Sequence, residues 1–256
     1  MDIDAEMQAT LERLAPQADA VRAAVTELVR NREFTHPLSV LPLIVHAVET
    51  GAPEPAVPLA VVHELWWISA CHLDDLADGQ GAHLGGDLGG AEALLAAFVS
   101  GTPLPLLVVQ SQAVPESVRG ALSAEIVKCS ILATEGQLSD LRGDPAKATR
   151  DSVVTAYRGK SGAPFSMVTA MAAEWAGAER ARVELWRDFG DVFDTLLAPV
   201  VLGRYEDDIN EFRGEAHRIL DELGGDETYL SVIRNLVDES SRMLLRADRA
   251  REVTVG

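Results

Sequence analysis

Residues 11–28 show the most regular alternation of apolar and polar positions in the chain. Their apolar residues recur at spacings of three and four: Leu11, Leu14, Ala18, Val21, Val25 and Leu28. This spacing places the apolar side chains in one stripe along a helix. We therefore expect an amphipathic helix across this segment.

The rest of the chain also shows helical patterns, separated by short breaks. We expect one helix after Pro37 and further helices at about 56–78, 89–100, 116–139, 149–176, 179–213 and 226–250. The segment Gly51–Pro55 predicts a loop, and the apolar run at 106–109 fits either a strand or the end of a helix. No repeat or linker divides the sequence, so we expect one all-α domain, a helical bundle spanning residues 1–256.

Composition supports a folded helical protein and restricts its partners. Hydrophobic residues make up 47% of the chain and aromatic residues 5%, a bias that favours helices over sheets. The formal net charge is −18, so we expect no nucleic acid and no anionic lipid as a partner. An anionic substrate would need bound cations or a local group of basic residues.

Cysteine usage and apolar stretches favour a cytoplasmic protein without stable membrane insertion. Cys71 and Cys129 lie far apart and show no metal-ligand spacing, which is typical of a reduced protein. The acidic N-terminal residues contain no apolar signal core. The longest apolar stretch, Pro55–Cys71, includes His63 and Glu64, and we interpret it as a buried helix.

The first candidate functional residues lie in the sequence HLDDLADG at 72–79. On a helix, Asp74 and Asp78 are one turn apart on the same face, and Asp75 is offset by about 100°. The preceding residues, ELWWISAC, are apolar enough to be buried. Carboxylates that leave a core together repel one another, and a divalent cation with oxygen ligands relieves this repulsion. A solvated helix end is the alternative interpretation.

A second acidic cluster, RYEDDINEFRGE at 204–215, also follows an apolar run. Three of its acids are spaced i, i+4 and i+8 along one helical face: Asp207, Glu211 and Glu215. Asp208 lies beside the first of them. Two such helices facing each other would hold Mg²⁺ ions across a gap, and these ions would attract a diphosphate. Ordinary ion pairs with Arg204 and Arg213 are the alternative.

Four short motifs follow one another along the chain: DDLAD at 74–78, EGQLSDL at 135–141, KSG at 160–162 and DDINE at 207–211. In order and spacing they resemble the two aspartate-rich motifs, the GQxxDL element and the Lys-Thr element of the trans-isoprenyl diphosphate synthases. The resemblance covers about residues 30–215 and extends to the related class I terpene synthases. It implies an isoprenoid-synthase-like helical bundle around a central apolar cavity, a prenyl diphosphate substrate, Mg²⁺ as cofactor and a homodimer.

The acidic clusters and the resemblance together suggest roles for individual residues. Mg²⁺ would be bound by Asp74, Asp78, Asp207, Glu211 and Glu215, and Asp75 and Asp208 complete the two catalytic motifs. Candidates for diphosphate contacts are Lys160, Arg204 and Arg158, because basic side chains, Arg above all, suit phosphate oxygens. The apolar pocket would be lined by Trp66, Trp67, Ser69, Ala70 and Gln137.

The chain departs from the chain-elongating members of this family at the site that binds isopentenyl diphosphate. Their GGKxxRP segment corresponds to NREFTHP at 31–37, with Glu33 for the lysine and His36 for the arginine. Trp67 replaces a histidine of the same site, and the Arg-Arg-Gly after the first motif is absent. We therefore expect ionisation of an allylic diphosphate without addition of isopentenyl diphosphate.

The function expected first is that of a class I terpene synthase acting on farnesyl or geranylgeranyl diphosphate. A prenyltransferase that uses an acceptor other than isopentenyl diphosphate is the second possibility. A chain-elongating polyprenyl diphosphate synthase with a rebuilt second site is the third. A regulatory subunit of an active synthase is the non-enzymatic alternative, against which the intact DDLAD motif argues.

Overall fold

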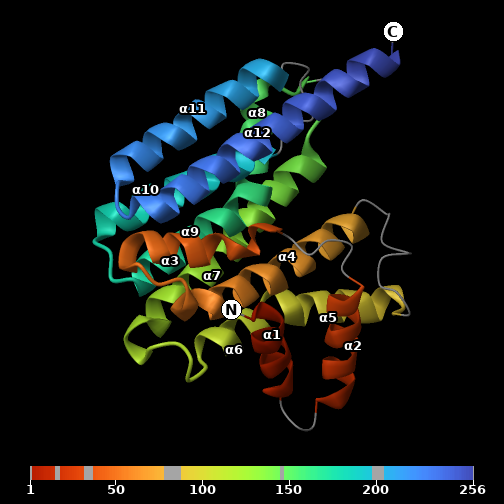
Figure 1. The fold of residues 1–256 in the computed structure, drawn as a ribbon. Helices are drawn as coiled ribbons and strands as arrows, with labels where there is room; N and C mark the ends of the chain where they lie inside the picture. Colours follow the sequence, from red (N-terminus) through yellow and green to blue (C-terminus); the bar gives the residue numbers. More distant parts are fainter. Residues whose placement is uncertain are drawn as a thin grey trace.

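The computed structural model describes residues 2–14, 18–31, 37–77, 88–144, 147–197 and 205–255, and the regular elements in these ranges are all helices (Figure 1). The expected all-α fold is thus confirmed. In chain order the α-helices are α1 (Ile3–Glu12), α2 (Asp19–Arg30), α3 (Leu41–Thr50), α4 (Val57–Ala77), α5 (Gly90–Gly101), α6 (Pro103–Val109), α7 (Glu116–Arg142), α8 (Arg150–Tyr157), α9 (Ala163–Trp175), α10 (Arg180–Leu197), α11 (Tyr205–Leu223) and α12 (Glu227–Val255). Two short 3-10 helices, η1 (Pro37–Val40) and η2 (Glu54–Ala56), precede α3 and α4, and a π-helix, η4 (Arg158–Gly162), joins α8 to α9.

Two of the expected helices are divided in the structure. The pattern at 11–28 is split between α1 and α2, with Pro16 in the intervening sequence. The expected helix at 179–213 is likewise split between α10 and α11, with Pro199 in the intervening sequence. The ambiguous run at 106–109 belongs to helix α6.

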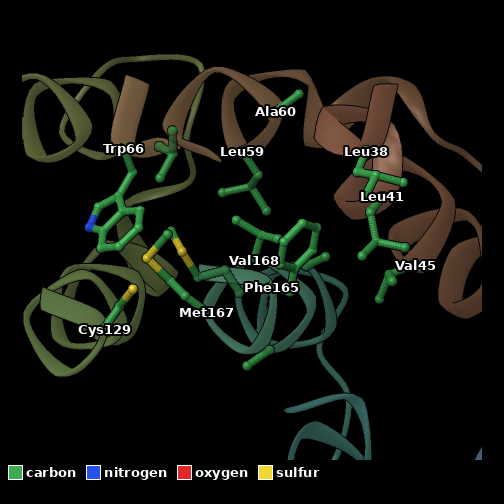
Figure 2. Packing of buried hydrophobic residues seen from close by; sticks show 14 of the residues in the cluster. Leu38, Leu41, Val45, Leu59, Ala60, Trp66, Cys129, Phe165, Met167 and Val168 are labelled. Atoms are coloured by element: carbon green, nitrogen blue, oxygen red, sulfur yellow. The ribbon is translucent and has the colours of Figure 1, made fainter. Parts of the chain in front are cut away.

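Helix α9 lies at the centre of the bundle. Its sequence offers apolar or small side chains on nearly every face, and a helix of this kind is stable only when surrounded. Helices α10, α7, α3 and α4 pack around it. Figure 2 shows Phe165, Met167 and Val168 of α9 beside Leu59 and Trp66 of α4, where they form part of the hydrophobic core.

Buried apolar side chains from α1 to α12 form one cluster, which extends from Met7 to Val237. This cluster includes side chains from both the N-terminal helices and the two C-terminal helices, α11 and α12. The organisation of the chain as a single domain stays a prediction.

Two segments are long and apolar enough to cross a bilayer by length and composition, Glu54–Ala77 and Gly90–Val109. Within the bundle, 72% of the apolar window of the first and 50% of that of the second are buried. The first, which contains α4, is therefore packed as a core helix. The second leaves part of α5 uncovered. The expected lack of membrane insertion stays a prediction.

Candidate functional site

Asp74, near the C-terminal end of α4, is contacted by side chains from two other elements. Gln137 of α7 donates from Nε2 to Asp74 Oδ1 at 2.7 Å, and Lys160 Nζ lies 2.7 Å from the same oxygen. Lys160 also donates to Asp140 Oδ2 at 3.2 Å. Three motifs that are far apart in the sequence therefore meet around one carboxylate.

A contact between two glycines brings these elements together. Gly136 of α7 lies against Gly159 of η4, and a Cβ atom added at Gly136 would come within 2.6 Å of the Gly159 carbonyl carbon. Because neither residue has a side chain, the two helix backbones approach closely. The neighbouring residues, Gln137 and Lys160, are thereby placed on the same side, facing Asp74. The π-helix at 158–162 agrees with this, since such bulges are frequent at functional sites.

Lys160 stays charged in this position. Burial alone would lower the pKa of its ammonium group, but the hydrogen bonds and charges of Asp74 and Asp140 outweigh burial and raise the pKa above its usual value. Lys160 therefore offers a fixed positive charge for an anionic group.

An apolar cavity of about 680 Å³ begins at this point and runs along α4. The five residues expected to line a pocket are all in its wall: Trp66, Trp67, Ser69, Ala70 and Gln137. Asp74 and Lys160 also line it, together with residues of α5 and α7 such as Leu95, Phe98 and Thr134. The volume lies in the range of ordinary ligand pockets. From Asp74 back to Trp66 the cavity follows about 12 Å of helix.

The second acidic cluster lies on the first turns of α11, where arginines from α8 and η4 contact it. Arg150 Nε donates to Asp208 Oδ1 at 2.7 Å, and its Nη2 donates to Glu211 Oε2 at 3.0 Å. Arg158 Nη2 lies 3.8 Å from Glu215 Oε2. Asp207 is exposed. The i, i+4, i+8 face expected from the sequence is therefore turned partly outward, and Asp208 takes the inner position.

Sequence reasoning missed three residues of this region. Arg150 belongs to none of the motifs, although the segment 150–160 carries Arg150, Arg158 and Lys160 in an otherwise acidic chain. That local excess of basic residues was the available signal. Asp191 and Asp194 of α10 were also missed, because no motif contains them.

Asp191 and Asp194 are carboxyl groups in a largely desolvated part of α10. Burial raises the pKa of Asp191 to about 6, against the opposing effect of Arg158, whose Nε lies 3.4 Å from Asp191 Oδ2. Burial, with the charge of Asp191, raises the pKa of Asp194 to about 8. Asp194 Oδ2 has no hydrogen-bond partner among the described residues.

The acidic residues of α4 and α11 have the ligand chemistry that Mg²⁺ requires, because this ion prefers carboxylate oxygens. Among the residues that the structure describes, however, no three acidic, His or Cys side chains lie close enough together to hold a metal. Lys160, Arg158 and Arg150 contact carboxylates that would otherwise be available. The expected ligands are thus not assembled: Asp74 is at the cavity mouth with Asp75 half-buried beside it, whereas Glu211 and Glu215 lie on α11.

Two further expected residues, Asp78 and Arg204, lie outside the described residues. The same holds for Glu33 and His36, on which the expected loss of an isopentenyl diphosphate site partly depends. Trp67, the third residue of that argument, is described and lines the cavity.

The arrangement of the helices is the one found in a solved geranyltranstransferase and a solved polyprenyl synthetase, so the fold expected from the motifs is confirmed. Solved structures with this fold match nearly the whole chain. A geranyltranstransferase from Methanosarcina mazei aligns with a TM-score of 0.76 at 14% identity, covering 95% of this chain and 96% of that chain.

Two other solved structures are similar to a comparable degree. A geranylgeranyl pyrophosphate synthetase from the archaeon Geoglobus acetivorans gives a TM-score of 0.75 at 12% identity, covering 93% of this chain and 97% of that one. A polyprenyl synthetase from Streptomyces coelicolor A3(2) gives 0.75 at 17% identity, covering 93% and 96%. No family model matches the sequence, and no curated protein matches it significantly.

Proposed function

We propose that this protein is a Mg²⁺-dependent enzyme that binds an allylic prenyl diphosphate and transfers its prenyl group. The observation that carries the proposal is the contact of Lys160 with Asp74 at the mouth of the 680 Å³ apolar cavity. A fixed cation and a carboxylate at the entrance of an apolar pocket are suited to a ligand with an anionic head and a hydrocarbon tail. The tail would lie along α4, towards Trp66.

Different residues of the chain would bind the diphosphate and orient the group beside it. Lys160 would donate to its oxygens, and Gln137 would keep Asp74 oriented. Asp74 and Asp75 on one side and acids of α11 on the other would hold Mg²⁺, which would supply positive charge that stabilises the diphosphate as a leaving group. The apolar walls exclude water from the allylic cation, and aromatic faces such as that of Trp67 stabilise its charge.

We rank prenyl transfer above cyclisation, which the sequence led us to expect first. The solved structures with this fold are named as a geranyltranstransferase and as prenyl synthetases, which supports transfer to a second molecule. Chain elongation with isopentenyl diphosphate is therefore the first form of the proposal. Cyclisation stays the second candidate, because Trp67 stands in the cavity wall and packs edge-on against Phe165, with ring centroids 5.6 Å apart.

Product analysis distinguishes chain elongation from cyclisation. The purified protein would be incubated with Mg²⁺ and geranyl or farnesyl diphosphate, with and without isopentenyl diphosphate. Longer diphosphates that form only with isopentenyl diphosphate support elongation, and a hydrocarbon or alcohol from the single substrate supports cyclisation. If none of these substrates is consumed under either condition, the proposed function is wrong.

We also propose that the protein is a homodimer joined through α5 and α7. Five large apolar side chains on these helices are more than 45% exposed, and we call this set the apolar face: Leu94, Leu95, Phe98, Val127 and Ile131. An exposed apolar patch of this kind marks an interaction surface. With a net charge of −18 two copies repel each other, and contact through a face with few charges keeps this repulsion low. A second copy would cover the open side of the cavity at Leu95 and Phe98.

A further inference from the structure

Asp191 of α10 contacts both ends of the π-helix η4. Its Oδ2 lies 3.4 Å from Nε of Arg158, the first residue of η4. Its Oδ1 lies against Gly162, the last residue, where an added Cβ atom would come within 2.9 Å of this oxygen. One carboxylate of α10 therefore spans the whole length of η4.

Two other residues of η4 make contacts of the candidate site. Gly159 packs on Gly136 of α7, and Lys160 contacts Asp74 of α4. The π-helix is thus held between α10 and α7. A movement of η4 away from α7 would carry Lys160 away from Asp74.

A second cavity leaves part of η4 without close packing. It has a volume of about 320 Å³, and its wall includes Arg158, Gly159, Asp191 and Gly136. A π-helix is a rare form of backbone. A void beside it supplies no partner atoms, so apolar contacts on that side do not hold it in place. The polar contacts of Asp191 therefore matter more here than they would on a closely packed helix.

The charge of Asp191 is unfavourable for the stability of α10. Burial raises the pKa of this carboxyl group to about 6, because the charged form is poorly solvated. An asparagine of almost the same size would avoid this cost. The carboxylate therefore serves its contacts with η4 and not the packing of its own helix.

We infer that Asp191 is a positioning residue, which holds η4 against α7 and thereby keeps Lys160 in the orientation that receives a diphosphate. Asp191 acts from behind η4, because it lies on the wall of the second cavity, whereas Lys160 lies on the wall of the first. This inference rests on the proposed function, since Lys160 is the group that would donate to the diphosphate.

The replacement Asp191→Asn keeps the shape of the side chain and removes its charge. Electrostatics alone predicts tighter binding of an anion, because the protein loses a negative charge. If Asp191 positions Lys160, inorganic pyrophosphate with Mg²⁺ should instead bind about fivefold more weakly, the modest energy of a partly exposed ion pair.

Gly162→Ala is a second variant that acts on the same contact. Its Cβ atom would displace the Asp191 carboxylate, so pyrophosphate should again bind more weakly than to wild type. Alanine favours a helix over glycine, so a loss of helix stability does not explain this result.

The test combines calorimetric titration with inorganic pyrophosphate and Mg²⁺ and nuclear magnetic resonance of the full-length protein labelled with 15N-lysine. The chain contains three lysines, Lys128, Lys147 and Lys160, so loss of a signal in Lys160→Gln assigns the Lys160 ammonium group. Its hydrogen bonds should separate this signal from those of the two exposed lysines in wild type. In Asp191→Asn the signal should move towards theirs.

Asp188→Asn is the matched control, because Asp188 is an exposed aspartate three residues earlier on α10. This control should leave the Lys160 signal and the pyrophosphate affinity near wild type. In the Lys160→Gln background, Asp191→Asn should cause no further loss of affinity, because Asp191 acts through Lys160.

The inference is overturned if Asp191→Asn binds pyrophosphate as tightly as wild type, or if it weakens binding equally with and without Lys160. An unchanged Lys160 signal in Asp191→Asn overturns it without reference to any ligand. A wild-type protein that does not bind pyrophosphate contradicts the proposed function, whereas the lysine signal still tests whether Asp191 positions Lys160. The two failures are therefore distinguishable.

Discussion

Lys160 contacts carboxylates from two helices, Asp74 of α4 and Asp140 of α7. Its aliphatic stem is mostly covered, with the side chain 22% exposed, so its hydrogen bonds are stronger than those of a surface lysine. The group that would hold a diphosphate is therefore pre-oriented before any ligand binds.

We expect Lys160→Gln to weaken Mg²⁺-dependent pyrophosphate binding by about 10- to 100-fold, the range for loss of a charged hydrogen bond. Calorimetry would measure the affinity, and circular dichroism would verify that helicity is retained. Lys147→Gln is the control, because Lys147 also pairs with an aspartate, Asp144 at 2.9 Å, but is 84% exposed. Equal affinities of Lys160→Gln and wild type would show that Lys160 does not touch the ligand.

The raised pKa of Asp194 predicts that the free energy of unfolding depends on pH. Its folded-state pKa of about 8 lies above the value of about 3.9 in an unfolded chain, so between these values the folded state binds more protons. The free energy of unfolding should thus fall as pH rises through this range. Asp194→Asn removes the effect, and its stability relative to wild type should rise steadily between pH 4 and pH 8, by roughly 5 kcal/mol.

Chemical denaturation at several pH values would measure this difference, with exposed Asp221→Asn as the control. A difference for Asp194→Asn that stays flat from pH 4 to pH 8 would contradict the interpretation of Asp194 as a desolvated carboxyl group.

Single residues were predictable from the sequence where a motif contained them. Asp74, Gln137 and Lys160 belong to motifs whose order along the chain indicated a common site. Arg150 and Asp191 were not predictable, because their partners, Glu211 and Arg158, lie on other helices. Spacing within one helix does not reveal which side chains meet across the bundle.

At the scale of elements, the junction of α7 and η4 sets the geometry of the site. Gly136 and Gly159 bring the two backbones into contact, and a Cβ at Gly136 would meet backbone atoms that have little room to move. The two helices must separate to accept any side chain there. Gln137 and Lys160 would then move away from Asp74.

We expect Gly136→Ala to lower the free energy of unfolding by about 1–3 kcal/mol, the usual cost of overpacking, and to impair pyrophosphate binding. Gly120→Ala is the control on the same helix: a Cβ at Gly120 meets no atom within 4 Å, and the replacement should stabilise the protein by about 0.5–1 kcal/mol. Thermal or urea unfolding would measure both. The account of this junction is wrong if Gly136→Ala is as stable as Gly120→Ala.

The helices themselves were largely predictable, since the long segments around α4, α7 and α9 have clear patterns. The ends of the helices were less predictable. The periodicity at 11–28 continues across Pro16, although the structure divides it into two helices, and 179–213 was expected as one helix. The division matters for the site because DDINE at 207–211 begins a new helix, α11, instead of ending α10.

At the scale of the whole molecule, we propose that the apolar face of α5 and α7 forms the contact between two copies. A negative charge placed there should prevent two acidic copies from meeting. We expect Ile131→Glu, at a residue that is 64% exposed, to turn a dimer into a monomer in light scattering coupled to size exclusion. Met243→Glu, on α12 and 62% exposed, is the control and should leave the mass unchanged. A monomeric wild-type protein, or a dimeric Ile131→Glu variant, would contradict this surface as the interface.

The most direct test of the account is calorimetric titration of the protein with farnesyl thiolodiphosphate, an analogue that resists ionisation, with and without Mg²⁺. We predict Mg²⁺-dependent binding that Lys160→Gln weakens. We also predict that Thr134→Trp, which fills the cavity wall of α7, weakens binding of the analogue but leaves binding of inorganic pyrophosphate unchanged. Binding that needs no Mg²⁺, or that neither replacement affects, would show that the cavity beside Asp74 and Lys160 is not the prenyl diphosphate site.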